Sequence, residues 1–282
     1  MVVDNGAADI AGAIMLDDSS NVAIVNNTIA DNVSTASSEN SQIGVPHSAG
    51  LASEANDPRF QAMLPAGSPD FSDPVALFNN IFWNNNAFTL DQFGPGATLV
   101  NQGFIDFEIH GMTNNADTFT PRFSDLTNGQ ILGPDGVQRP VPANQGNQSG
   151  DPNFVTPFVL ELGVTGSRLV PQQAAVTITG ADPPVGLTGD YHLTPPAGIA
   201  ANASSPVVDR GARCSNTAFP PTAGALLACT GGGIQAPSGT PPVNQGDYDG
   251  QYRPQLRTIR ARTPWDLGAD ELAGVPVPGF GP

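Results

Sequence analysis

The chain has 282 residues, a length that fits one large domain or two small ones. Glycine (32 residues) and proline (28) make up about a fifth of it, which excludes a helical bundle and favours many short strands joined by turns. Aspartate and glutamate outnumber the basic residues by 26 to 10, and every basic residue is an arginine. The net charge of −16 argues against nucleic acid and anionic membrane surfaces as partners.

The two ends of the chain bear on its location. The first residues carry neither the basic region nor the apolar core of a signal peptide, and no apolar run is long enough to cross a membrane. We therefore interpret the chain as a fragment without its leader, with an intracellular protein as the alternative. Residues 274–282 form a Pro/Gly-rich tail of the kind that precedes a surface anchor. The expected location is extracellular or at the cell surface.

The first predicted strand, residues 13–16, ends at the acidic pair Asp17 and Asp18. Glycoside hydrolases use two carboxylates, so this pair is a candidate for catalysis on sugars. Adjacent strand residues point to opposite faces, however, and both could line one groove only if the turn rotated them. A solvated turn is the favoured interpretation, and a catalytic role is the alternative.

Residues 22–32 are repeated at residues 75–85. Both segments read apolar, small, apolar, apolar, Asn-Asn, and then a second short apolar run ending in asparagine. Similarity at a fixed offset indicates a solenoid, in which runs too short to bury a face alone stack on their neighbours. The offset is 53 residues, and the polar composition of residues 34–74 favours one coil with a long excursion over two coils. Asparagine is expected at coil corners, because it tolerates left-handed backbone and bonds to equivalent amides in adjacent coils.

The apolar residues of the repeat divide into core and surface candidates. We expect Ile24 and Phe78 to form apolar columns along the solenoid, and Phe78 and Phe82 to lie on the same side of a strand. Trp83 alternates outward and is a candidate platform for stacking against sugar, although an inward position at a coil corner is favoured. Alternation in residues 175–180 predicts another strand, and helix signals are almost absent.

Three histidines, His47, His110 and His192, are far apart and show no metal-ligand spacing. They are therefore interpreted as ordinary structural positions.

Two further pairs of residues lie near the C-terminal end. Cys214 and Cys229 lack a metal-binding spacing, and a disulfide that closes a local loop is favoured over two buried thiols. Such a bond supports secretion. Asp247 and Asp249 open an Asp-x-Asp-Gly pattern typical of calcium loops, but the downstream bidentate glutamate is missing. A turn paired with Arg253 is favoured there, and Ca²⁺ is the only cofactor that the sequence suggests.

Residues 12–33 resemble a coil of a right-handed parallel β-helix of the pectate-lyase-like type. Later segments resemble, in order, the C-terminal β-helix regions that precede interchangeable surface anchors in secreted bacterial proteins, the choice-of-anchor type. These segments are residues 80–84, 150–155, 189–193, 205–211, 247–254 and 266–271. The departures from that pattern are insertions near 111–148, 156–188 and 213–246.

The resemblance implies an all-β right-handed parallel β-helix with long loops and a C-terminal cap or tail. We divide the chain into regular coils over 1–110, irregular closing coils with long loops over 111–212, and a disulfide-containing cap and Pro/Gly-rich tail over 213–282.

The favoured function is a non-catalytic module of a secreted or surface-anchored protein with an adhesive, structural or fibre-forming role. It would self-assemble through its coil ends. The alternatives are a polysaccharide lyase or glycoside hydrolase, which rests on the architecture alone, and a glycan-binding module without turnover. The absence of lysine and of the pectin-hydrolase sequence patterns argues against an enzyme.

Overall fold

The computed structural model describes residues 1–193 apart from 93–95, 112–113, 171–172 and 183–188. Its regular structure consists almost entirely of short strands, and the described residues contain one helix of a single turn, α1 (Pro58–Gln61). This helix begins where the Asp57 carboxylate accepts a hydrogen bond from the amide of Arg59. No helix of the described part is both long and apolar enough to cross a membrane.

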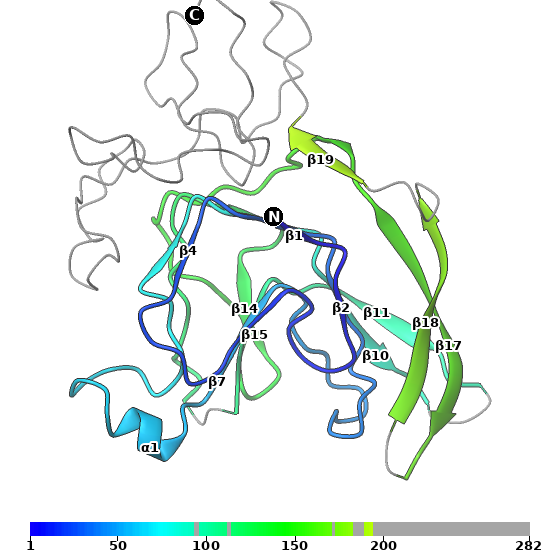
Figure 1. The fold of residues 1–282 in the computed structure, drawn as a ribbon, viewed down its shortest axis with the longest axis horizontal. Helices are drawn as coiled ribbons and strands as arrows, with labels where there is room; N and C mark the ends of the chain where they lie inside the picture. Colours follow the sequence, from blue (N-terminus) through cyan, green and yellow to red (C-terminus); the bar gives the residue numbers. More distant parts are fainter. Residues whose placement is uncertain (93–95, 112–113, 171–172, 183–188, 194–282) are drawn as a thin grey trace, which may run out of the picture.

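Strands from successive passages of the chain lie side by side and parallel in four sheets (Figure 1). The first sheet contains, in order, β1 (Val2–Val3), β5 (Thr28–Ala30), β9 (Ile81–Trp83) and β13 (Asp125–Leu126). The second contains β2 (Gly6–Ala7), β6 (Val33–Ser34) and β10 (Asn86–Leu90). The third contains β3 (Ile14–Leu16), β7 (Leu51–Glu54), β12 (Phe107–His110) and β14 (Gln130–Leu132). The fourth contains β4 (Ala23–Val25) and β8 (Ala76–Phe78). The chain thus visits the four sheets in the same order twice in succession, and we call each such passage a winding.

Antiparallel strands complete the described structure. They are β11 (Leu99–Phe104) on β10, β15 (Gln138–Pro140) on β14, β16 (Phe154–Thr156) with β19 (Asp190–Leu193), and β17 (Val159–Arg168) with β18 (Gln173–Asp182). The long hairpin of β17 and β18 lies beside β11 (Figure 1). The strand predicted over residues 175–180 is confirmed, since it lies within β18.

The two repeated segments of the sequence are direct neighbours in the fold. Ala23 pairs with Ala76 in one sheet, and Thr28 pairs with Ile81 in another. The offset of 53 residues is therefore one winding and not two. Residues 34–74 provide the long excursion and contain β7 and α1.

Asparagine pairs form the corner between the fourth and the first sheet. Asn26 and Asn79 take positive φ angles of 56° and 55°, the left-handed conformation that asparagine tolerates. The amide of Asn27 donates to Oδ1 of Asn80 at 2.9 Å, and Nδ2 of Asn80 donates to the carbonyl of Ile24 at 2.8 Å. The asparagine predicted at this corner thus turns the backbone and joins adjacent windings.

A second ladder of asparagines lies at the corner between the first and the second sheet. Nδ2 of Asn5 donates to Oδ1 of Asn32 at 3.0 Å, and Nδ2 of Asn32 donates to Oδ1 of Asn85 at 2.9 Å. Asn85 in turn donates to Oδ1 of Asp106 at 3.0 Å. Burial raises the pKa of the Asp106 carboxyl to about 7, and the hydrogen bonds from Asn85 and the Thr127 amide oppose that rise. The ladder gives buried polar groups partners across three windings.

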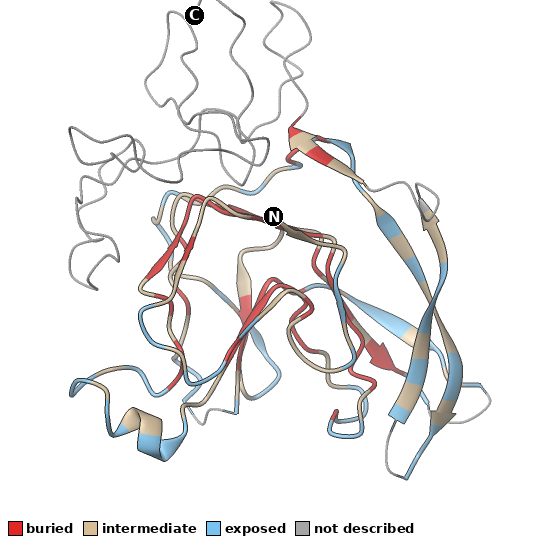
Figure 2. Ribbon diagram, viewed as in Figure 1, coloured by how far each residue is buried: buried red, intermediate tan, exposed pale blue. Residues whose placement is uncertain are grey.

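The main core lies between the sheets, where buried residues follow the inner faces of the strands (Figure 2). Its buried members are Leu16, Ile24, Ile29, Leu51, Phe71, Leu77, Phe82, Phe107, Ile109, Phe119, Leu126 and Ile131. The rings of Phe82 and Phe107 pack with centroids 4.6 Å apart. Ile24 lies in this core as expected. Phe78, by contrast, packs in a separate cluster with Ala76. The expectation that Phe78 and Phe82 share one strand is wrong, because the asparagine corner separates β8 from β9.

Candidate functional site

The acidic pair predicted from the sequence lies in an exposed turn directly after β3. Asp18 has a positive φ angle of 44°, and its carboxylate accepts a hydrogen bond from the amide of Asp57 at 2.7 Å. Asp18 therefore helps to hold the start of α1. Neither Asp17 nor Asp18 lines the two pockets described below.

Trp83 ends β9 at the asparagine corner and is half-buried. It packs against a second apolar cluster whose buried members include Ile81, Phe154 and Tyr191. Part of its surface stays open to solvent, so the predicted stacking against sugar remains a prediction. Cys214, Cys229, Asp247 and Asp249 lie outside the described residues, as does the whole predicted cap and tail.

Two histidines that are far apart in the sequence lie together around one glutamate, and we call His47, Glu108 and His110 the histidine cluster. Nδ1 of His47 lies 2.9 Å from Oε1 of Glu108, and Nδ1 of His110 lies 3.3 Å from the same oxygen. The amide of Ser48 donates to Oε2 at 2.6 Å. The two imidazole rings meet edge to face with centroids 5.3 Å apart. The three residues are near enough to hold a metal ion together.

The alternation of side chains along β12 explains why Glu108 and His110 lie together. Phe107 and Ile109 point into the main core, which puts Glu108 and His110 on the opposite face of the strand. The loop between β6 and β7 carries His47 over that face and buries Glu108 to 3 % exposure of its side chain. His110 keeps 44 % of its side chain exposed, so the cluster is open to solvent on one side.

The cluster has a definite charge arrangement. Burial opposes ionisation of Glu108, but hydrogen bonds from His110, His47 and the Ser48 amide outweigh it and lower the pKa of the carboxyl. The hydrogen bond to Glu108 raises the pKa of His110, and burial only partly offsets this rise. An ionised carboxylate thus faces imidazole nitrogens, an arrangement that can hold a proton or a metal ion.

Sequence reasoning missed this cluster. The interpretation of His47 and His110 as ordinary structural positions did not include their meeting, because it could not show that the fold brings both to Glu108. The Phe-Glu-Ile-His pattern of β12 was a signal that Glu108 and His110 share a face. No local signal points to His47, which lies 61 residues before Glu108 and reaches it through a loop.

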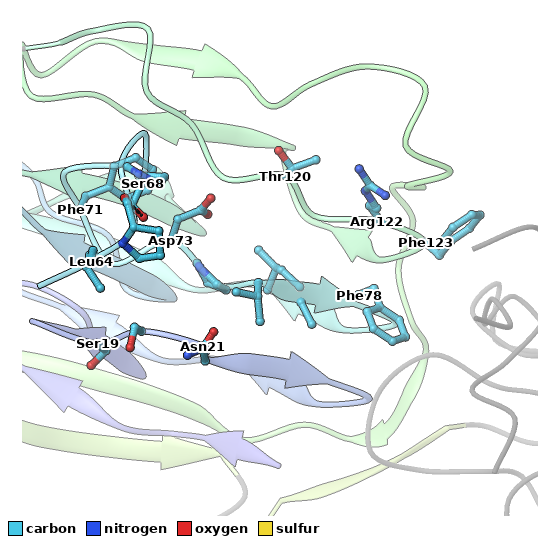
Figure 3. A pocket seen from close by; sticks show the side chains of 17 residues that line it. Ser19, Asn21, Leu64, Ser68, Phe71, Asp73, Phe78, Thr120, Arg122 and Phe123 are labelled. Carbon is cyan, nitrogen blue, oxygen red and sulfur yellow. Dashed lines mark hydrogen bonds between the residues drawn. The ribbon is translucent and has the colours of Figure 1, made fainter. Parts of the chain in front are cut away.

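A second site is a pocket of about 410 Å³ between the turn after β3, the segment that follows α1, strand β8, and residues 120–123 (Figure 3). Its walls are mostly apolar and include Leu64, Pro65, Pro69, Phe71, Pro74, Leu77, Phe78 and Phe123. We call it the proline-walled pocket. Apolar walls with a few polar groups are typical of sites that bind small ligands.

Asp73 and Arg122 are the charged residues that line this pocket. Burial raises the pKa of the Asp73 carboxyl to about 6. Within the described residues no hydrogen bond or ion pair holds either charged side chain. Toward a ligand the carboxylate can act as an acceptor and the guanidinium as a donor.

Comparisons with protein-family models, with curated proteins and with solved structures find no match for this chain.

Proposed function

We propose that the chain is a right-handed parallel β-helix module of a secreted or surface-anchored bacterial protein, with a non-catalytic role in adhesion, structure or fibre formation. The parallel register of successive windings supports the β-helix. The two asparagine ladders support it too, because they join equivalent corners of neighbouring windings.

The observation that carries the assembly role is a sheet edge at the first winding that no other described strand covers. Each of β1, β2, β3 and β4 pairs with only one other strand in the described part of the chain. An edge of this kind offers unpaired backbone groups to another strand. A second molecule placed there would extend all four sheets, and a head-to-tail contact that repeats gives a fibre.

Concentration-dependent assembly tests this role. Size-exclusion chromatography over a wide concentration range, with electron microscopy of the most concentrated sample, should show elongated oligomers. A protein that stays strictly monomeric at high concentration would contradict fibre formation through this edge.

A second candidate, a glycan-binding module, is favoured by the proline-walled pocket. Apolar and aromatic walls suit the faces of a sugar ring, while Asp73 and Arg122 suit its hydroxyl groups. Titration calorimetry with neutral and acidic oligosaccharides should detect binding that Asp73→Asn and Arg122→Gln weaken. If the wild-type protein binds none of them, this candidate fails.

Turnover is measured in the same samples, with and without Ca²⁺. New reducing ends or unsaturated uronates would reveal a hydrolase or a lyase. Either product would overturn the non-catalytic role and direct attention to carboxylates such as Asp73, Asp17 and Asp18. Bound glycan that stays intact would support binding without turnover.

A further inference from the structure

We propose that His47, Glu108 and His110 form a binding site for a divalent transition-metal ion of the zinc type. The proposal stands apart from the proposed function, since a structural, adhesive or glycan-binding module could equally carry it. Two imidazoles and one carboxylate are a donor set that zinc and its first-row neighbours accept.

The spacing of the donor atoms fits such an ion. Bonds of about 2.0–2.2 Å place two ligand atoms of a tetrahedral zinc site about 3.3–3.6 Å apart. Oε1 of Glu108 lies 2.9 Å from Nδ1 of His47 and 3.3 Å from Nδ1 of His110. One donor atom from each residue lies within 4.8 Å of the others. Because His110 is on the open side, its ring can make the adjustment that a bound ion requires.

Negative charge around the cluster also favours a cation. The carboxylate of Asp9 lies 3.8 Å from Nε2 of His47. Glu54 pairs with His110 across the β7–β12 ladder, and both residues line the pocket of about 280 Å³ on which the cluster opens. Three carboxylates thus face two imidazoles. A divalent ion would offset the excess negative charge, and the pocket gives it a path from solvent.

Rigid support on one side completes the site. The carboxylate of Glu108 is held by the Ser48 amide at 2.6 Å, and a hydroxyl–carboxylate bond of 2.6 Å between Ser41 and Asp9 orders the loop that carries His47. Metal sites depend on such outer contacts to orient their ligands. Two of the three ligands are thus preorganised, and one can move.

The test uses the full chain, stripped of metal with a chelator and titrated with Zn²⁺ in a calorimeter. We expect one ion per chain and a higher melting temperature with Zn²⁺ present. Co²⁺ in place of Zn²⁺ should give the visible absorption of a site with nitrogen ligands. No saturable Zn²⁺ binding by the folded protein would overturn the proposal and leave a hydrogen-bonded cluster only.

Variants locate the site. His110→Ala removes an exposed ligand without disturbing the core, and should weaken Zn²⁺ binding at least about 100-fold. Glu108→Gln keeps the shape of the buried side chain and should have a similar effect. Should Glu108→Gln fail to fold, His110→Ala decides the question by itself.

His192→Ala is the matched control. The chain has three histidines, and His192 lies on β19 beside Asp190, away from the cluster. It should bind Zn²⁺ as the wild type does. Equal losses in His110→Ala and His192→Ala would overturn the proposal. Ca²⁺ that displaces Zn²⁺ at equal concentration would also overturn it, because histidine nitrogen is a poor ligand for calcium.

Discussion

At the residue scale, Tyr191 of β19 places one hydroxyl proton between two carboxylates. Its oxygen lies 3.0 Å from Oδ1 of Asp4 and 2.9 Å from Oδ2 of Asp31. The hydroxyl can donate only one hydrogen bond, so the second contact needs a protonated carboxyl that donates to the tyrosine oxygen. Burial raises the pKa of Asp4 to about 6 and that of Asp31 to about 7. The contact is therefore sensitive to pH.

Asp31→Asn should flatten the pH dependence of stability. The pKa of this carboxyl rises from about 3.9 in the unfolded chain to about 7 in the fold. Its contribution to the free energy of unfolding is therefore fully present below pH 4. That contribution is lost as the pH rises through 7. Asparagine cannot ionise, and it tolerates the positive φ angle of 53° found here. Urea unfolding at pH 5 and pH 8 should show a smaller fall in the free energy of unfolding for the variant than for the wild type. An equal fall in the free energy of unfolding for the variant and the wild type would contradict the raised pKa of Asp31.

Gly50 shows how closely neighbouring windings approach. A Cβ atom at this position would overlap the backbone carbonyl oxygen of Asp106, which cannot move without disturbing the next strand. Gly50→Ala should therefore lower the free energy of unfolding by about 2 kcal/mol or more. Gly166→Ala is the control, because an added methyl group there meets no described atom within 4 Å apart from its chain neighbours. Chemical denaturation measures both free energies of unfolding. Similar losses in the two variants would contradict the prediction that the Asp106 carbonyl cannot move away from the added methyl group.

At the scale of elements, the corners and not the strands carry much of the specificity. The strands of the repeat have three residues each, which is too short to define a register by themselves. The asparagine ladders set the register, because each buried amide has partners only when the windings are aligned.

Asn80→Ala should cost about 2–3 kcal/mol of unfolding free energy, because it leaves the partly buried Asn27 amide without its side-chain partner and removes the bond from Nδ2 to the Ile24 carbonyl. Asn114→Ala removes two hydrogen bonds of an exposed turn instead, to Asp117 and Ala116. Water replaces those bonds, so the control should lose well under 1 kcal/mol. A ladder variant as stable as this control would mean that the corner amides do not set the register.

At the scale of the whole molecule, a substitution of Met15 tests the proposed assembly. The amide of Ile14 donates to the Gly50 carbonyl, so alternation along β3 sends the amide of Met15 to the free edge. Met15→Pro removes that donor and blocks strand addition. We expect the variant to stay monomeric in sedimentation experiments, and Met15→Ala to assemble as the wild type does. Assembly by Met15→Pro at the wild-type concentration would exclude this edge as the interface.

By itself the sequence determined the short strands, the one-winding offset between residues 22–32 and 75–85, and the asparagine corners. These features depend on residues close together in the chain, whose backbone preferences and periodic pattern are visible locally.

Only the tertiary structure decided which distant side chains meet. The loop that carries His47 to Glu108 and the strand β19 that carries Tyr191 to Asp31 have no period from which a contact could be read. The corner between Phe78 and Phe82 separates two residues that look equivalent in the sequence. The physical reason is the same in each case, because the path of a loop and the place of a corner are set by packing and buried hydrogen bonds between segments that are far apart in the chain.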